Sequence, residues 1–170
     1  MHTSEYRVDP RMIPPVILSM GLAIALLYLE GTTNRGFLLL LVLLPFFYLG
    51  LEILARKITV DSRGILVSKF LRSVFVEWPE IVSVDAVQSG AKLFIILQTD
   101  QSRPVLITNT ISPFHELTDQ ILKSVPPSKV SETSRSLLLE TPRKHGPLMH
   151  AWIVCLVMAA MVAGKFLGYA

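Results

Sequence analysis

The sequence predicts a membrane protein in which three transmembrane helices hold one small α+β domain at the bilayer surface. The chain has 170 residues, of which 51% are apolar and only 17% are charged, with a mean hydropathy of +0.52. Soluble domains are about one quarter charged, so this deficit favours a bilayer. Three long apolar runs are separated by a middle segment of short β-type runs, which indicates where the folded domain lies.

The three spans are predicted at residues 12–29, 36–55 and 147–167. At a rise of about 1.5 Å per residue, helices of this length cross a hydrocarbon core about 30 Å thick. The alternative of buried helices in a soluble protein is disfavoured because Leu38 to Leu44 is apolar all round. A cleaved signal peptide is the alternative for the first run. No small-x-small cleavage site follows that run, so we expect it to be retained.

The distribution of lysine and arginine predicts the orientation of the spans. Twelve of the 16 basic residues lie in the middle segment, and Arg7 and Arg11 lie in the N-terminal tail. Only Arg35 and Lys165 fall on the opposite side. We therefore expect a multi-pass protein of a bacterial inner (cytoplasmic) membrane, with the N-terminus and the middle domain cytoplasmic and the C-terminus outside.

The domain organisation follows from these spans. The predicted segments are a cytoplasmic N-terminal tail (1–11), a transmembrane hairpin (12–55), a cytoplasmic β domain (56–127), a linker (128–146), the third transmembrane helix (147–167) and a C-terminal tail (168–170).

The middle domain is predicted to contain six short strands and one closing helix. The strands are expected at 58–60, 65–70, 73–78, 81–87, 93–99 and 105–108. Short connections make neighbouring strands antiparallel, and Gly64 is expected to need a positive φ in the first turn. Ser112 is the expected N-cap of the helix, with Pro113 at its first position, and an apolar stripe runs from Phe114 to Val125. The result is a bent antiparallel sheet or partial barrel plugged by a helix.

The segment Trp78-Pro79-Glu80-Ile81-Val82-Ser83-Val84 and the opening hairpin around Asp61 and Gly64 resemble the bacterial pleckstrin-homology (PH-like) domains. The resemblance covers about 70 residues and implies a PH-like domain anchored by the preceding helical hairpin. Basic turns in such domains can bind phosphorylated lipid heads, but the first hairpin loop here has no dense basic cluster. The fold alone does not define a function.

The linker at 128–146 is rich in serine, threonine and charged residues, which is typical of a mobile tether. Leu137-Leu138-Leu139 interrupts it. A short turn docked on the sheet or the membrane is the favoured interpretation, and a partner-binding anchor is the alternative.

The sequence contains no nucleophile motif, no phosphate-binding loop and no paired carboxylates at a useful spacing, so we expect no enzyme activity and no cofactor. Cys155 is the single cysteine, and no cluster of cysteine and histidine has metal-ligand spacing. Basic residues do not form the stripe expected of a nucleic-acid partner. Glu52 is expected to pair with Arg56 one turn later, with a functional intramembrane carboxylate as the alternative. His150 is interpreted as an interfacial side chain, with a proton relay as the alternative.

Basic residues at the domain's turns and at the ends of the spans are candidates for contact with lipid or a partner. They are Arg56, Lys57, Arg63, Lys69, Arg72, Arg143 and Lys144. Ala160 and Gly164 have a small-xxx-small spacing in the third span that permits close helix–helix packing, including self-association.

Three functional hypotheses follow. The leading one is a non-enzymatic accessory protein that scaffolds, assembles or stabilises a larger membrane complex with other membrane protein subunits. The second is a module that binds or senses anionic membrane lipids. The third is a small transporter or channel subunit, which is disfavoured because the spans carry few polar residues.

Overall fold

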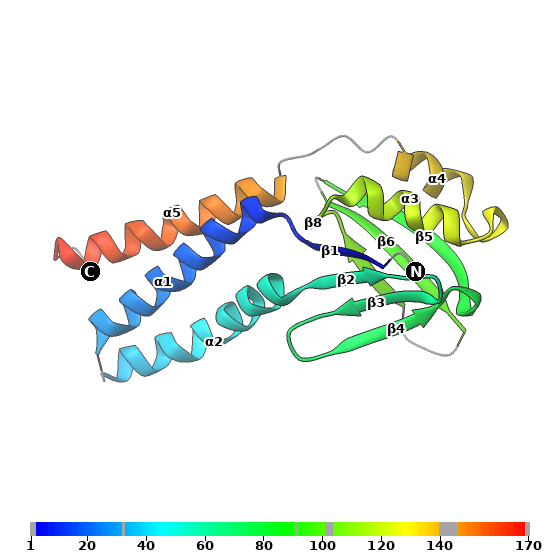
Figure 1. Ribbon diagram of the computed structural model, residues 1–170. Helices are drawn as coiled ribbons and strands as arrows, with labels where there is room; N and C mark the ends of the chain where they lie inside the picture. The colour runs from blue at the N-terminus through cyan, green and yellow to red at the C-terminus, as the bar shows by residue number, and fades with distance from the viewer. Residues whose placement is uncertain (1–2, 32, 91, 101–103, 140–145, 169–170) are drawn as a thin grey trace.

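The computed structural model describes residues 3–31, 33–90, 92–100, 104–139 and 146–168. Within these residues, three helices are long and apolar enough to cross a membrane: α1 (Ile13–Glu30), α2 (Asn34–Ala55) and α5 (Gly146–Phe166). They extend from one end of a compact region of strands and shorter helices (Figure 1). Helix α5 lies alongside α1, so the first and last helices of the chain are neighbours (Figure 1).

The strands form two antiparallel sheets. A five-stranded sheet has the order β4-β3-β2-β1-β8, and a three-stranded sheet has the order β5-β6-β7. The strands are β1 (Ser4–Val8), β2 (Lys57–Val60), β3 (Gly64–Ser68), β4 (Ser73–Glu77), β5 (Ile81–Ser89), β6 (Lys92–Thr99), β7 (Val105–Thr108) and β8 (Ile111–Ser112). Both sheets turn their apolar faces toward a common core, which contains the fully buried Ile58, Ile65, Ile95 and Leu97.

Strand β1 corrects the expectation of an N-terminal tail at residues 1–11. It pairs antiparallel with β2, with Ser4 opposite Val60 and Arg7 opposite Lys57, and its end pairs with β8. Tyr6 and Val8 alternate with charged residues and are buried in the core. The two-helix hairpin is therefore inserted between two adjacent strands of one sheet.

Helix α3 (Phe114–Ser124) closes the core, and its predicted apolar stripe is confirmed, since Leu117 and Ile121 are fully buried. The predicted cap is wrong. Ser112 pairs with Arg7 as the end of β8, and Pro113 occupies the N-cap position with no side-chain cap. The helix begins at Phe114, one residue later than expected, so the N-cap is a proline, whose side chain has no oxygen to accept a hydrogen bond from the first turn.

The expected tether after α3 is largely folded against the domain. A 3-10 turn (Pro127–Lys129) leads into helix α4 (Glu132–Leu139), and Leu138 is buried in the core. The Ser134 hydroxyl accepts a 2.9 Å hydrogen bond from the backbone N–H of Ala86 in β5. The expected docking on the sheet is therefore confirmed, but the docked segment is an eight-residue helix and not the short turn that was expected. Residues 140–145 lie outside the described part of the chain.

Gly64 is required for a reason other than the positive φ expected from its turn. Its φ lies outside the left-handed region, but a Cβ at this position would come within 2.1 Å of the carbonyl oxygen of Val76 on β4. The carboxylate of Asp61 accepts hydrogen bonds from the N–H groups of Arg63 and Gly64, and these bonds lower the pKa of that carboxyl. The close approach of β3 to β4, and not the turn, selects glycine.

Replacing Gly64 by alanine is therefore expected to destabilise the domain by about 2 kcal/mol, because the new methyl group would displace the β4 backbone. The measurement is the thermal unfolding temperature of the full chain in mild detergent. Gly21→Ala is the control, since a Cβ on that residue of α1 would meet nothing within 4 Å. Equal melting temperatures for Gly64→Ala and the parent protein would contradict the steric account.

Candidate functional site

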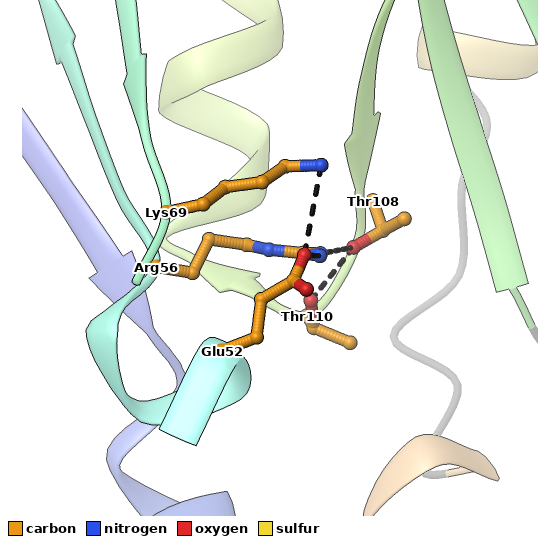
Figure 2. A network of polar contacts seen from close by, with 5 residues as sticks. All are labelled: Glu52, Arg56, Lys69, Thr108 and Thr110. Carbon is orange, nitrogen blue, oxygen red and sulfur yellow. Dashed lines mark hydrogen bonds and ion pairs between the residues drawn. The ribbon is translucent and has the colours of Figure 1, made fainter. Parts of the chain in front are cut away.

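A polar network joins the end of α2 to the sheets (Figure 2). Glu52 lies in the last turn of α2, and its Oε1 is 3.5 Å from Nη2 of Arg56 and 3.7 Å from Nζ of Lys69. The predicted pair of Glu52 and Arg56 is thus confirmed, and Lys69 joins it from the turn between β3 and β4. All three side chains are less than one quarter exposed, so water screens their charges only partly.

The network continues into β7 through two hydroxyls. Nη1 of Arg56 donates to Oγ1 of Thr108 at 3.1 Å, and the Oγ1 atoms of Thr108 and Thr110 are 2.7 Å apart (Figure 2). Arg56 adopts an extended backbone between α2 and β2, which aims its side chain across to the other sheet. One guanidinium therefore connects α2, the junction with β2 and the end of β7.

The surroundings of Lys69 in this network lower the pKa of its ammonium group. Burial lowers the pKa of Lys69, the positive charges of Arg56 and Arg72 lower it further, and Glu52 opposes both effects. A lysine whose pKa is lower in the folded state than in the unfolded state reduces the free energy of unfolding while it is protonated. This reduction disappears as the pH rises from the lowered pKa to the ordinary one.

A pocket of about 550 Å³ lies beside this network, between the ends of the three apolar helices and the edge of the sheets. Its lining combines apolar side chains of α1, α2 and α5 with polar groups near the sheets. These polar groups come from the residue between α2 and β2, from β6, from β7 and from the turn between β7 and β8. The residues are Met12, Val16, Ser19, Met20, Phe46, Leu49, Gly50, Ile53, Arg56, Lys92, Phe94, Thr108, Thr110, His150, Ala151 and Val154. We call this space the junction pocket.

The predicted contact residues do not form one group. Arg56 and Lys69 meet at Glu52, and Arg72 lies in the same turn as Lys69, whose N–H donates to the Arg72 carbonyl at 2.7 Å. Arg63 lies in the turn between β2 and β3, which is at the other end of β3. Its guanidinium is 4.0 Å from Asp61, so the exposed Arg63 belongs to a separate pair with a half-buried carboxylate.

Lys57 forms a different pair on β2. Its Nζ is 2.6 Å from Oε2 of Glu5 on β1, and the same carboxylate also accepts from Arg7 at 2.7 Å. These contacts lower the pKa of Glu5. The pair lies across the β1–β2 ladder, where opposite charges stabilise the pairing modestly. Arg143 and Lys144 lie outside the residues that the structure describes.

The remaining predicted positions lie on α5. His150 is exposed beside the junction pocket, and its Nδ1 is 2.7 Å from the carbonyl oxygen of Gly146. Ala160 is exposed, and a Cβ on Gly164 would meet nothing within 4 Å. Packing through Ala160 and Gly164 would therefore involve another molecule, and it stays a prediction.

At the far end of the helices, Lys165 pairs with Glu30, with Nζ 2.6 Å from Oε1. Both side chains are less than one quarter exposed. The ion pair joins the end of α1 to the last turn of α5 and adds a specific polar contact to a largely apolar helix pair.

No group of three or more histidine, cysteine, aspartate and glutamate side chains lies close enough to hold a metal ion within the described residues. Comparisons with protein-family models, with curated proteins and with solved structures found no match.

The sequence predicted the pair of Glu52 and Arg56 but did not bring Lys69 to it. Lys92 was recognised only as a basic residue beside a turn, and Thr110 was not recognised as a lining residue of the pocket. The length of β3 could have placed Lys69 near α2. Strand β3 runs antiparallel to β2 for five residues, so its last residue, Ser68, lies opposite Lys57, close to the end of α2. The contact with Thr108 had no local signal, since 52 residues separate it from Arg56.

Replacing Glu52 by glutamine is expected to lower the stability of the full chain by about 2 kcal/mol, because Arg56 and Lys69 would keep their charges without the carboxylate between them. The measurement is thermal unfolding in mild detergent at neutral pH. Glu5→Gln is the matched control, since Glu5 also contacts two basic side chains but is more exposed. Equal effects of the two substitutions would contradict a special role for the buried network.

Proposed function

We propose that this chain is a non-enzymatic, membrane-anchored accessory protein whose PH-like domain scaffolds, assembles or stabilises a larger membrane protein complex. In this proposal α1, α2 and α5 span a bacterial inner membrane, and the domain lies on the cytoplasmic side. Two antiparallel sheets closed by α3 support the PH-like assignment. The three long apolar helices, which leave the domain at one end, support the membrane assignment (Figure 1).

The pairing of β1 with β2 also supports the placement of the N-terminal segment and the domain on one side of the membrane. Strand β1 lies in the same sheet as β2, so the N-terminal segment and the middle domain must share one side of any membrane that α1 and α2 cross. The positive-inside rule then favours the cytoplasmic side for both.

The observation that carries the scaffold proposal is the free edge of β4. In the described residues β4 pairs only with β3, so its other edge presents unpaired backbone groups. Phe75 is exposed on the outer face of this strand, opposite the half-buried Leu66. An unpaired strand edge with an exposed aromatic side chain is suited to strand addition by a partner.

Phe75→Glu is expected to reduce recovery of partner subunits when the tagged full chain is purified from its host in gentle detergent. Loss of an aromatic contact at the centre of an interface costs about 2 kcal/mol, or about thirtyfold in affinity. Mass spectrometry of the co-purified proteins measures the change.

Leu106→Glu is the control for this experiment, because Leu106 is equally exposed but lies on β7 of the other sheet. Unchanged recovery with Phe75→Glu, or a chain that is monomeric and free of partners in every detergent, would contradict the scaffold proposal.

A second candidate function, a module that contacts anionic lipid, is favoured by the turn between β3 and β4. The exposed Phe70 and Leu71 form the tip of this turn, with Lys69 and Arg72 on either side. The Phe70 ring contacts Tyr48 of α2 edge-on, with 6.5 Å between ring centroids. Tyr48 precedes the end of α2 by seven residues, or about 10 Å. If α2 crosses a bilayer, the tip would therefore lie among the head groups and upper acyl chains of one leaflet.

Depth-dependent quenching tests this candidate. With Leu71→Cys in a Cys155→Ser background, an attached environment-sensitive fluorophore is expected to shift to the blue in liposomes and to be quenched by lipids labelled near the head group. Ser62→Cys is the control, since it lies in the turn at the opposite end of β3. A fluorophore at residue 71 that stays as water-exposed as one at residue 62 would exclude insertion of the tip.

A further inference from the structure

The junction pocket has a gradient from apolar to cationic lining. Its deep part is formed by α1 and α2 side chains such as Met20 and Phe46, and Val154 borders it on α5. Ser19 adds no free polar group there, because its hydroxyl donates to the Val16 carbonyl at 2.9 Å. The end nearest the sheets presents Arg56, Lys92 and the hydroxyls of Thr108 and Thr110. Such a lining fits a ligand with an apolar tail and a polar head.

The charged end of the pocket is positive. Among the described residues its lining includes no aspartate or glutamate, and Lys92 forms no ion pair. Glu52 neutralises only one of the two charges on Arg56 and Lys69. The buried Nε of Arg56 also has no acceptor within the described part of the chain, although buried donors are normally satisfied. These charges favour a negatively charged head group.

The depth of the pocket identifies the source of such a ligand. The lining residues of α1 extend from Met12 to Met20, a distance of about 12 Å along the helix, at the end of the span that meets the domain. If the helices cross a bilayer, this depth corresponds to the head groups and upper acyl chains of one leaflet. Lipid is then the molecule that surrounds the pocket.

We propose that the junction pocket binds one anionic glycerophospholipid. An acyl chain lies between α1, α2 and α5, and the phosphate lies near Lys92, Arg56 and Thr110. The volume of about 550 Å³ is in the usual range of ligand pockets, about 300–1,000 Å³, and accommodates part of one lipid. Basic pockets between membrane helices on the cytoplasmic side commonly hold anionic head groups. The inference rests on the membrane insertion in the proposed function, but not on the scaffold role.

Native mass spectrometry of the full chain in mild detergent tests the proposal, with phosphatidylglycerol and phosphatidylcholine as the added lipids. One phosphatidylglycerol per chain is expected to bind more tightly than phosphatidylcholine. Lys92→Gln is expected to weaken phosphatidylglycerol binding about fivefold, as the loss of one lysine near a phosphate implies. Arg63→Gln, at the opposite end of β3, is expected to leave binding unchanged.

A second pair of variants tests the location without altering charge. Val154→Trp is expected to fill the pocket and abolish the bound lipid, whereas Val157→Trp changes a similarly exposed residue of α5 that does not line it. Each variant is also assayed for membrane integration by alkaline extraction, so that failed insertion is distinguished from lost lipid. Equal binding of both lipids, or equal binding to both tryptophan variants that remain integrated, would overturn the proposal.

Discussion

The pairing of β1 with β2 is the constraint on which the rest of the structure depends. These strands are adjacent in the sheet but are separated in the chain by two helices of 18 and 22 residues. Their register therefore fixes where α1 begins and where α2 ends. Because both helices attach at one edge of the domain, they must leave it in the same direction, and any membrane they cross lies at that edge (Figure 1).

The same pairing accounts for the space at the junction. Neighbouring strands are about 4.8 Å apart, whereas packed helices are about 8–10 Å apart. The chain must therefore diverge between the last strand pair, Arg7 with Lys57, and the first contact between the helices. A 3-10 turn (Pro10–Met12) begins this divergence on one side, and the extended Arg56 begins it on the other. Helices α1 and α2 approach closely at Met20 and Gly50, and both of these residues line the pocket.

The sequence predicted the elements whose signals are local. The apolar runs identified all three long helices, and short β-type runs between turn signals identified β2 to β7 to within about two residues at their ends. The elements it missed depend on distant partners. Ser4–Val8 carries two buried residues among charges, and only the return of the chain after α2 supplies the neighbouring strand. Ile111–Ser112 is a strand of two residues because β1 lies beside it.

Helix α4 is another element whose structure depends on distant partners. Its polar composition is typical of a tether, but Ser134 bonds to β5 and Leu138 enters the core. A single parallel bridge between Val84 and Val130 also lies along this edge of β5. The edge of β5 is therefore covered, whereas the edge of β4 is open to an added strand in the described residues. The sequences of the two strands alone do not reveal this difference.

The polar network is best understood as the means by which the divergent chains are held in one arrangement. Apolar contacts at the junction would tolerate many angles between α2 and the sheets, because the hydrophobic effect is not directional. Arg56 removes this freedom by bonding to Glu52 on one side and to Thr108 on the other. Buried ionic groups contribute little net stability compared with apolar packing, but their geometry is specific. The network thus fixes the domain relative to α2 and leaves a net positive charge beside the pocket. In the proposed membrane setting, an anionic lipid both compensates that charge and fills the space that the divergence of the helices creates.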